Sequence, residues 1–432
     1  MAHIKVLSVK IACTSGLIKD LRIDSPQPEY QSASHVIAVS GWVVSARPIQ
    51  ITLHSRGRQI GTMRTVDCPD ALELLGAAHD PARSTHVGLR FEGEAGVAGL
   101  CGHSALQIRA RLDEATDIPL ARIALDVSGP AWDGDPPRMT PLLVTSLARS
   151  GTTWAMRILG THPQLVAFRE YPYEVRVAQY WAHMFAVLTS PANHGESAPT
   201  DLFYGSPRWV GHNPFFSTRA ADLFSWLDGH YANDFAKFTR AQISGVYQHA
   251  AQRQDKAATG YFIEKADVAN PYRHVLRFLF PHTREIYLIR DPRDMLCSIL
   301  AFNRQRGEQS FGMVPSESIR QYTRRLGSMI ATLTSELHTY RDQSYLVRYE
   351  DMVRDPVSCL RSMLEYLQVD SDARVVTSML RDAAGDTDLL QRHRTSSSPH
   401  QSVGRWKKDL APDLRELCEE QCREFLTAFG YR

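Results

Sequence analysis

In the first third of the chain, apolar and polar residues alternate with a period of two. The alternation is clear over residues 49–54, 87–91 and 106–112, and the turn sequence Ser55-Arg56-Gly57-Arg58 follows the first of these runs. A period of two with one apolar face is typical of half-buried antiparallel strands, and strands at this spacing suit a sandwich. We therefore predict an all-β sandwich over residues 1–128.

The pattern changes after a segment rich in glycine and proline. Residues 128–137 contain two glycines and three prolines, which predicts a linker, placed at 129–140. Beyond it, short continuous apolar runs at 141–147, 284–289 and 345–347 are each followed by a helical pattern. Continuous apolar strands are buried on both faces, as in a parallel sheet covered by helices. The sequence thus predicts an α/β domain with a parallel central sheet over residues 141–432.

Composition excludes several classes of protein. The 432 residues carry 49 Lys+Arg against 47 Asp+Glu, and 43% are hydrophobic, so neither long disorder nor a global field for nucleic acid is expected. No apolar run approaches the roughly 18 residues of a membrane span, and the N-terminal residues do not resemble a signal peptide. The seven scattered cysteines include no CxxC pair. We expect a cytoplasmic protein with reduced thiols and no bound metal; the sequence leaves its oligomeric state open.

The most informative segment is Arg149-Ser150-Gly151-Thr152-Thr153-Trp154, which lies between a buried strand and a helix predicted over 154–160. Such a turn directs backbone N–H groups to one point at the positive end of the helix dipole, and Arg149 adds a full charge. It predicts a phosphate site of P-loop type, although the Walker sequence GxxxxGK[ST] is absent. The alternative is a plain strand–turn–helix corner capped by Ser150.

A second corner has the same construction. The apolar strand 285–289 leads into Arg290-Asp291-Pro292-Arg293-Asp294, and Ser298 follows eight residues after Arg290. If Asp291 caps the helix and Pro292 takes its first position, Ser298 lies roughly two turns inside it. Arg290 and Ser298 could then hold one further phosphate.

Together these segments resemble the sulfotransferases that use 3′-phosphoadenosine 5′-phosphosulfate. Two more segments agree in the family's order, namely Val347-Arg348-Tyr349-Glu350-Asp351 and Ser402-Val403-Gly404-Arg405-Trp406-Lys407-Lys408. The resemblance covers about residues 141–429 and leaves the predicted sandwich outside it. It implies a P-loop-like α/β fold, the phosphosulfate as donor, adenosine 3′,5′-bisphosphate as product, and no metal.

The resemblance also assigns the donor-binding residues. It implies that the first motif holds the 5′-phosphosulfate, that Arg290 and Ser298 bind the 3′-phosphate, and that Tyr349 lies against the adenine. Trp154 either stacks on the adenine or belongs to the core. The loop that folds over the nucleotide supplies Ser402, Gly404, Arg405 and Trp406, and Arg405 is the preferred phosphate ligand because arginine binds phosphate with two parallel hydrogen bonds.

Sulfuryl transfer requires cations directed at the leaving oxygens and a base for the acceptor hydroxyl. Many cytosolic members carry Lys where this chain has Arg149, and an arginine cannot deliver a proton. Lys265, which resembles the family's strand-end lysine, is therefore the second cation; the alternative is a surface lysine paired with Glu264. For the base we prefer Glu174, with Glu170 in reserve; the alternative for Glu174 is a structural pair with an arginine on one helix turn.

The reaction predicted on this resemblance is transfer of a sulfuryl group to an acceptor hydroxyl, with a carbohydrate or glycoconjugate as the first candidate acceptor. A phenol, a tyrosine, a lipid or a secondary metabolite are further candidates. Two other functions stay open: a nucleotide kinase or NTPase that uses the same anion site, and a glycan-binding sandwich joined to an inactive transferase. The first would require Mg²⁺-dependent ATP binding, whereas the transferase requires the bisphosphate and no metal.

Overall fold

The computed structural model describes two compact units, each made of several stretches of chain. The first comprises Met1–Pro136, Ala178–Gln242 and Pro271–Pro281, and the second comprises Pro137–Val177, Ile243–Asn270 and His282–Arg432. The predicted domain boundaries stay a prediction, and most of the predicted linker lies among residues that the structure leaves out. The structure describes all residues except 1, 13–16, 69–86, 114–115, 131–137, 190–220, 257–259, 308–310, 315, 386–394 and 432.

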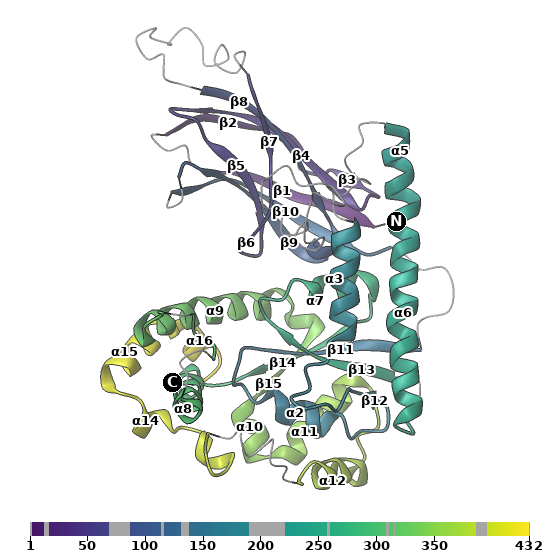
Figure 1. Cartoon of the computed structure of the whole chain (residues 1–432), viewed down its shortest axis with the longest axis vertical. Helices are drawn as coiled ribbons and strands as arrows, with labels where there is room; N and C mark the ends of the chain where they lie inside the picture. Colours follow the sequence, from purple (N-terminus) through teal and green to yellow (C-terminus); the bar gives the residue numbers. More distant parts are fainter. Residues whose placement is uncertain are drawn as a thin grey trace. The chain divides into compact units, whose positions relative to one another are not determined.

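The N-terminal part of the first unit is a pair of antiparallel sheets, which confirms the predicted all-β region (Figure 1). The six-stranded sheet has the order β3-β1-β10-β9-β5-β6 and the four-stranded sheet the order β2-β4-β8-β7. Apolar residues of alternate positions, such as Leu53, Ile108 and Phe91, are fully buried, because one face of each strand meets the interior. The strands are β1 His3–Ile11, β2 Ile18–Ser25, β3 Gln31–Ser32, β4 Val36–Ser45, β5 Gln50–Ser55, β6 Arg58–Thr62, β7 Arg64–Asp67, β8 Val87–Gly96, β9 Gly102–Arg111 and β10 Asp117–Ser128.

Helices complete the first unit. His35 of the sheet region donates its backbone N–H to Asp228 Oδ1 at 2.7 Å, and its ring hydrogen-bonds Asn233 Oδ1 at 3.0 Å. These contacts join the sheets to the helices by polar bonds as well as by packing, since the His35 ring also meets Phe278 edge-on. The elements are η2 Ala98–Leu100, α3 Val177–Thr189, α5 Ala221–Trp226, the π-helical η4 Leu227–Tyr231, the first half of α6 Ala232–Arg253, and α7 Tyr272–Leu279.

The second unit is built on a five-stranded sheet in which every neighbouring pair is parallel. Its order is β12-β13-β11-β14-β15, so β11 lies in the middle with later strands on both sides. At such a change of direction the chain leaves a crevice at the carboxyl ends of the strands, where α/β proteins bind ligands. The strands are β11 Met139–Ser146, β12 Leu165–Val166, β13 Gly260–Asp267, β14 Arg284–Ile289 and β15 Ser344–Arg348.

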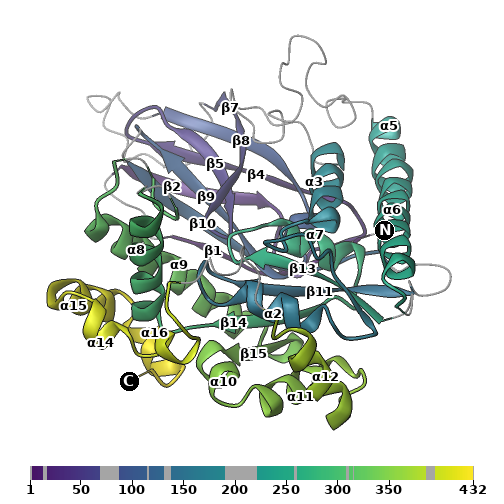
Figure 2. The same cartoon turned by 60° about the horizontal axis from the view of Figure 1, so that its bottom comes forward.

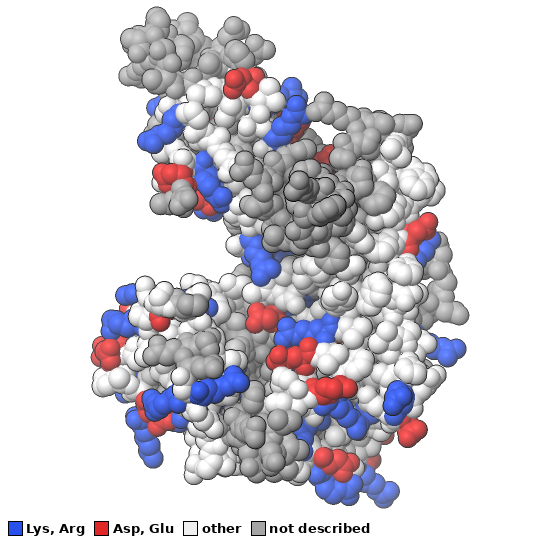
Figure 3. Space-filling view, in the orientation of Figure 1, with Lys and Arg blue, Asp and Glu red and all other residues white. Residues whose placement is uncertain are grey.

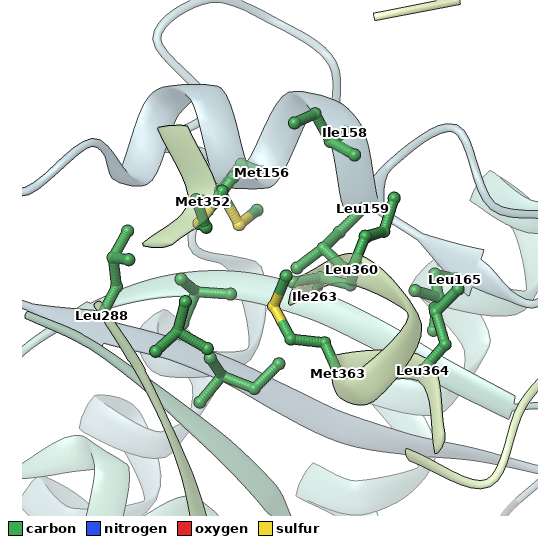
Figure 4. Close-up of a cluster of buried hydrophobic side chains, with 14 of the residues drawn as sticks. Met156, Ile158, Leu159, Leu165, Ile263, Leu288, Met352, Leu360, Met363 and Leu364 are labelled. Atoms are coloured by element: carbon green, nitrogen blue, oxygen red, sulfur yellow. The ribbon is translucent and has the colours of Figure 1, made fainter. Parts of the chain in front are cut away.

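Apolar side chains cover both faces of this sheet, as the continuous apolar runs predicted. Ile286 and Leu288 of β14 belong to the core beneath α2, α10, α11 and α12, whereas Tyr287 and Ile289 belong to the core beneath α8, α9, α15 and α16. Figure 4 shows the first core, in which side chains of α2 and α11 meet above the strands. Figure 2 shows α10, α11 and α12 together beside β14 and β15.

Local sequence sets the ends of two helical segments in the second unit. Helix α9 begins behind a capping box of Ser318 and Gln321, and the C-terminal helical segment is divided in two at Cys422, where the backbone leaves helical geometry. These elements are α2 Thr152–Leu159, the end of α6, α8 Pro292–Arg306, α9 Ile319–Thr339, η5 Arg341–Gln343, α10 Tyr349–Arg354, α11 Pro356–Leu367, α12 Ala373–Asp382, η6 His400–Ser402, α14 Trp406–Asp409, α15 Pro412–Gln421 and α16 Arg423–Ala428.

The surface carries mixed charge. On the face seen in Figure 3, Lys and Arg side chains lie interspersed with Asp and Glu, in line with the formal net charge of +2. Within the described part of the chain, no helix has the length and apolar character needed to cross a bilayer. Because the charges on this face are mixed, an anion site in this protein requires a local group of cationic side chains inside the fold.

Candidate functional site

The first corner begins where β11 ends and α2 begins. Arg149 and Gly151 both have positive φ, 66° and 92°, which bends the chain sharply before the first helical residue, Thr152. Gly151 is the N-cap of α2, and a Cβ at this position would lie 2.5 Å from Cδ2 of Tyr349. Only glycine suits both the left-handed backbone and the close approach.

Ser150 does not cap α2, so the alternative of a plain serine-capped corner is wrong in that detail. Its buried hydroxyl lies 3.7 Å from Sδ of Met295 on α8, and no side chain of the described residues caps α2. The first backbone N–H groups of α2 are therefore available to a ligand, as in other anion-binding helix N-termini.

Replacing Gly151 by alanine is expected to damage both stability and ligand binding. The substitution imposes a strained φ and pushes Tyr349 from its place, effects that together cost about 2–4 kcal/mol. Thermal unfolding of Gly151→Ala should show a clear fall in Tm. As a control, Gly245→Ala adds a Cβ that meets nothing within 4 Å. Equal stability of both variants would contradict the proposed tight contact.

The second corner has the predicted geometry. Asp291 caps α8 and accepts a hydrogen bond from the backbone N–H of Arg293 at 2.9 Å, with Pro292 at the first helical position. Arg290 leaves the end of β14, and both Arg290 and Ser298 are buried. The rigid cap therefore fixes the direction in which Arg290 leaves the sheet.

The two corners meet, although their residues are 141 positions or more apart in sequence. Arg149 Nε donates to Ser298 Oγ at 3.0 Å, and Arg290 Nη1 donates to the carbonyl oxygen of Arg149 at 3.0 Å. We call Arg149, Arg290 and Ser298 the cationic cluster. Burial, together with the nearby positive charge of Arg290, lowers the pKa of Arg149 to about 10. Two buried like charges strongly favour an anion between them.

Tyr349 and Ser402 adjoin the cationic cluster. The Arg290 guanidinium lies 4.5 Å from the centre of the Tyr349 ring, and its Nη2 donates to the Ser402 carbonyl at 2.7 Å. The hydroxyls of Tyr349 and Ser402 hydrogen-bond at 2.9 Å, and Trp154 meets Tyr349 edge-on at 6.2 Å. Four predicted segments therefore supply side chains to one place.

Thr395 is a member of this site that the sequence did not identify. Its hydroxyl lies 3.1 Å from Ser298 Oγ, and Arg405 Nη1 donates to its carbonyl at 2.8 Å and to its hydroxyl at 3.2 Å. Arg405 also pairs with Asp409 at 2.7 Å. The only sequence signal was the run of hydroxyl residues at 395–398, which by itself is typical of an ordinary loop.

Gly404 and Trp406, also predicted to bind the donor, have other contacts. The backbone N–H groups of both residues donate to the carboxylate of Asp294. The Trp406 ring lies over the Arg293 guanidinium at 3.8 Å. Through these contacts Gly404 and Trp406 bind the loop to α8, while Ser402 and Arg405 of the same loop adjoin the cationic cluster.

Lys265 lies on β13, beside β11, and only 5% of the residue is exposed. Its Nζ donates to Thr153 Oγ1 at 2.8 Å and to the Pro172 carbonyl, and lies 3.5 Å from Glu174 Oε1. The alternative of a surface pair with Glu264 is wrong, because consecutive strand residues face opposite sides and Glu264 accepts from Tyr247. Burial lowers the pKa of Lys265 to about 8, against the opposing effect of Glu174.

The two candidate bases differ in placement. The Glu174 side chain is 52% exposed and lies beside Lys265, in the segment before α3 rather than on a helix turn. Glu170 is exposed, and its backbone carbonyl accepts a hydrogen bond from the N–H of Tyr173 at 2.7 Å. Tyr171 was not predicted; burial raises its pKa to about 12, Arg149 opposes the rise and Glu174 adds to it. Of the two glutamates, Glu174 is the one that lies beside a cation, Lys265.

This geometry defines a class: an α/β protein with a P-loop-like turn and a buried cationic anion site at the carboxyl edge of a parallel sheet. The family model described as the sulfotransferase family matches residues 141–373. The chain belongs to the sulfotransferase family.

Individual relatives are distant. Carbohydrate sulfotransferase 1 of Danio rerio is 25% identical over 158 residues, which cover 34% of this chain and 38% of that protein. Among solved structures, the sulfotransferase domain from the curacin biosynthetic pathway covers 67% of this chain and 98% of its own, with 16% identity and a TM-score of 0.41. A mouse sulfotransferase, SULT7A1, complexed with PAP covers 69% and 90%, with 14% identity and a TM-score of 0.35.

Proposed function

We propose that the protein transfers a sulfuryl group from 3′-phosphoadenosine 5′-phosphosulfate to a hydroxyl of an acceptor. The observation that carries this proposal is the meeting of Arg149, Arg290 and Ser298 beside the α2 N-terminus, with Lys265 on the adjoining strand. The family match supports the class of reaction. The cytoplasmic location expected from the sequence belongs to the same proposal.

The described residues fit a doubly phosphorylated adenosine. Arg290 Nε is buried and has no hydrogen-bond partner in the described part of the chain, as expected of a group that completes its contacts with a ligand. The open α2 N-terminus suits the 5′ side, and Ser298, Thr395 and Arg405 surround the 3′ side. Tyr349 offers a ring for the base between them.

The bound donor supplies the sulfuryl group and a phosphate leaving group. Arg149 stabilises negative charge without giving up a proton. Lys265, held by Thr153 and the Pro172 carbonyl, stabilises the leaving oxygen and can protonate it, because its pKa of about 8 is close to the working pH. Glu174 accepts the proton of the acceptor hydroxyl, and its exposure leaves it open to an incoming acceptor.

A carbohydrate or glycoconjugate is the proposed acceptor. The support is limited to curated relatives, which are named carbohydrate sulfotransferases and which this chain matches over 38% of their length. The aromatic-rich segment 180–247, which is expected to build the acceptor pocket, includes residues 190–220, which lie outside the described part. The acceptor therefore has to be identified by screening.

The pH dependence of turnover should report Lys265. Because the pKa of this lysine lies below its ordinary value, at about 8, its cationic form is complete below pH 7 and is lost as pH rises through 8. We expect kcat to fall about tenfold between pH 7.5 and 9. Lys265→Arg, slower overall, should lose this alkaline fall because arginine stays charged. An identical alkaline fall of kcat in the wild type and in Lys265→Arg would show that Lys265 is not the group whose titration limits turnover.

A transfer assay tests the function. Radiolabelled donor and a panel of glycans, phenols and lipids, incubated with the enzyme in EDTA, should give at least one labelled acceptor. Loss of transfer in EDTA, together with phosphoryl transfer from Mg²⁺-ATP, would favour the kinase instead. Bisphosphate binding without transfer to any acceptor would favour a glycan-binding protein with an inactive transferase domain.

A further inference from the structure

Asp294 is a buried carboxylate that does not serve its own helix. It lies in the first turn of α8, where Asp291 already provides the N-cap, and 1% of the residue is exposed. Its Oδ2 accepts from the backbone N–H of Gly404 at 2.6 Å, and its Oδ1 accepts from that of Trp406 at 2.9 Å. Both oxygens therefore bind the loop that carries Ser402 and Arg405.

The loop is shaped to receive this anion. Gly404 is left-handed, with φ of 71°, and Arg405 is right-handed, with φ of −62° and ψ of −25°. Two residues of opposite hand turn the flanking N–H groups toward one point and form a nest for an anion. The anion in this nest is the Asp294 carboxylate, which accepts from the N–H groups of Gly404 and Trp406.

The contact between the Asp294 carboxylate and the loop depends on the charge of the carboxylate. Burial raises the pKa of Asp294 to about 6, while the N–H groups of Trp406 and Gly404 lower it; nearby Asp291 raises it and Arg290 lowers it. The carboxylate thus stays mainly ionised at neutral pH, and its buried charge is balanced by the two loop N–H groups. Releasing the loop would leave that charge without these bonds.

We propose that Asp294 is a positioning residue that holds the turn at residues 402–406 in place before the donor arrives. Fixed at Gly404 and Trp406, the loop presents the Ser402 carbonyl and hydroxyl to Arg290 and Tyr349 and directs Arg405 toward Thr395 and Ser298. Preordering lowers the entropy lost when a ligand binds. The part that concerns the donor rests on the proposed function; the ordering of the loop does not.

Asp294→Asn tests this directly, because the amide keeps one acceptor and places a donor against the second N–H. Trypsin can cut after Arg405, Lys407 and Lys408. In ligand-free protein at pH 7.5, cleavage at these sites should be about tenfold faster than in the wild type. With donor, KM should rise about tenfold or more, while kcat at saturation stays within about twofold.

Two further variants serve as controls for the cleavage assay. Glu285→Gln changes another buried carboxyl side chain, on β14, which accepts from Thr145, and cleavage of the loop should be unchanged. Gly404→Ala should accelerate cleavage about threefold, because the new Cβ meets nothing within 4 Å and only its left-handed backbone is strained. The loop of the double variant Asp294→Asn, Gly404→Ala should be cleaved no faster than that of Asp294→Asn alone, because both substitutions disrupt the same contact.

The outcomes separate the two proposals. Unchanged loop cleavage in Asp294→Asn, or faster cleavage with an unchanged KM for the donor, would overturn the positioning role. If calorimetry shows no binding of adenosine 3′,5′-bisphosphate to the wild-type protein, the donor assignment itself is wrong, whatever the cleavage result. Faster cleavage together with the raised KM and nearly constant kcat supports the inference.

Discussion

Arg290→Ala is expected to weaken the binding of adenosine 3′,5′-bisphosphate by about 100-fold or more. The Arg290 guanidinium is buried and donates hydrogen bonds to the carbonyls of Arg149 and Ser402. Its buried Nε has no hydrogen-bond partner in the described part of the chain and can donate to a ligand. Charge-assisted hydrogen bonds contribute about 1.5–3 kcal/mol each. The loss of two such bonds from Arg290 to the bisphosphate therefore weakens its affinity by a factor of about 100 or more. Isothermal titration calorimetry in EDTA measures this difference.

Two controls interpret the result. Arg290→Lys keeps the charge without the fork and should recover only part of the affinity. Arg320→Ala removes a half-exposed arginine that pairs with Asp413 on the surface, and it should leave the affinity unchanged within about twofold. Equal effects of Arg290→Ala and Arg320→Ala would exclude Arg290 from the anion site.

Glu174→Gln is expected to lower kcat by about 10²–10⁴, the usual contribution of a positioned general base, without a comparable change in bisphosphate affinity. The reason is position: Glu174 Oε1 lies 3.5 Å from Lys265 Nζ, and the glutamate side chain is 52% exposed. Steady-state kinetics with an acceptor found by screening, together with calorimetry, gives both quantities.

The reserve candidate supplies the comparison for Glu174. Glu170→Gln, four residues earlier in the same segment, should retain most of the turnover if Glu174 is the base. The reverse order, with Glu170→Gln inactive and Glu174→Gln active, would transfer the role to Glu170. Full activity of both variants would show that neither carboxylate takes the proton.

The sequence predicted the parts of this protein that depend on local pattern. Alternation over residues 49–54 and 106–112 located strands of the N-terminal sheets, and the continuous run at 284–289 located a strand buried on both faces. The Asp291-Pro292 cap was readable because capping depends on neighbouring residues. Parallel pairing also followed, because continuous apolar strands separated by helices suit no other sheet.

The sequence did not reveal contacts between distant residues. Ser298, a partner of Thr395, lies 97 positions away from it, and Gly404, a partner of Asp294, lies 110 positions away. Lys265 was identified, but its burial and its bond to Thr153 depend on how β13 pairs with β11. Ser150 was expected to act as a cap in the structural alternative, yet Gly151 takes that position because Tyr349 packs against it.

The most direct test compares two nucleotides that differ in one phosphate. With wild-type protein in EDTA, adenosine 3′,5′-bisphosphate should bind about 100-fold more tightly than adenosine 5′-monophosphate, and Arg290→Ala should remove most of that difference. If the wild-type protein binds both nucleotides equally, or if the preference survives in Arg290→Ala, the two corners do not share one doubly phosphorylated ligand.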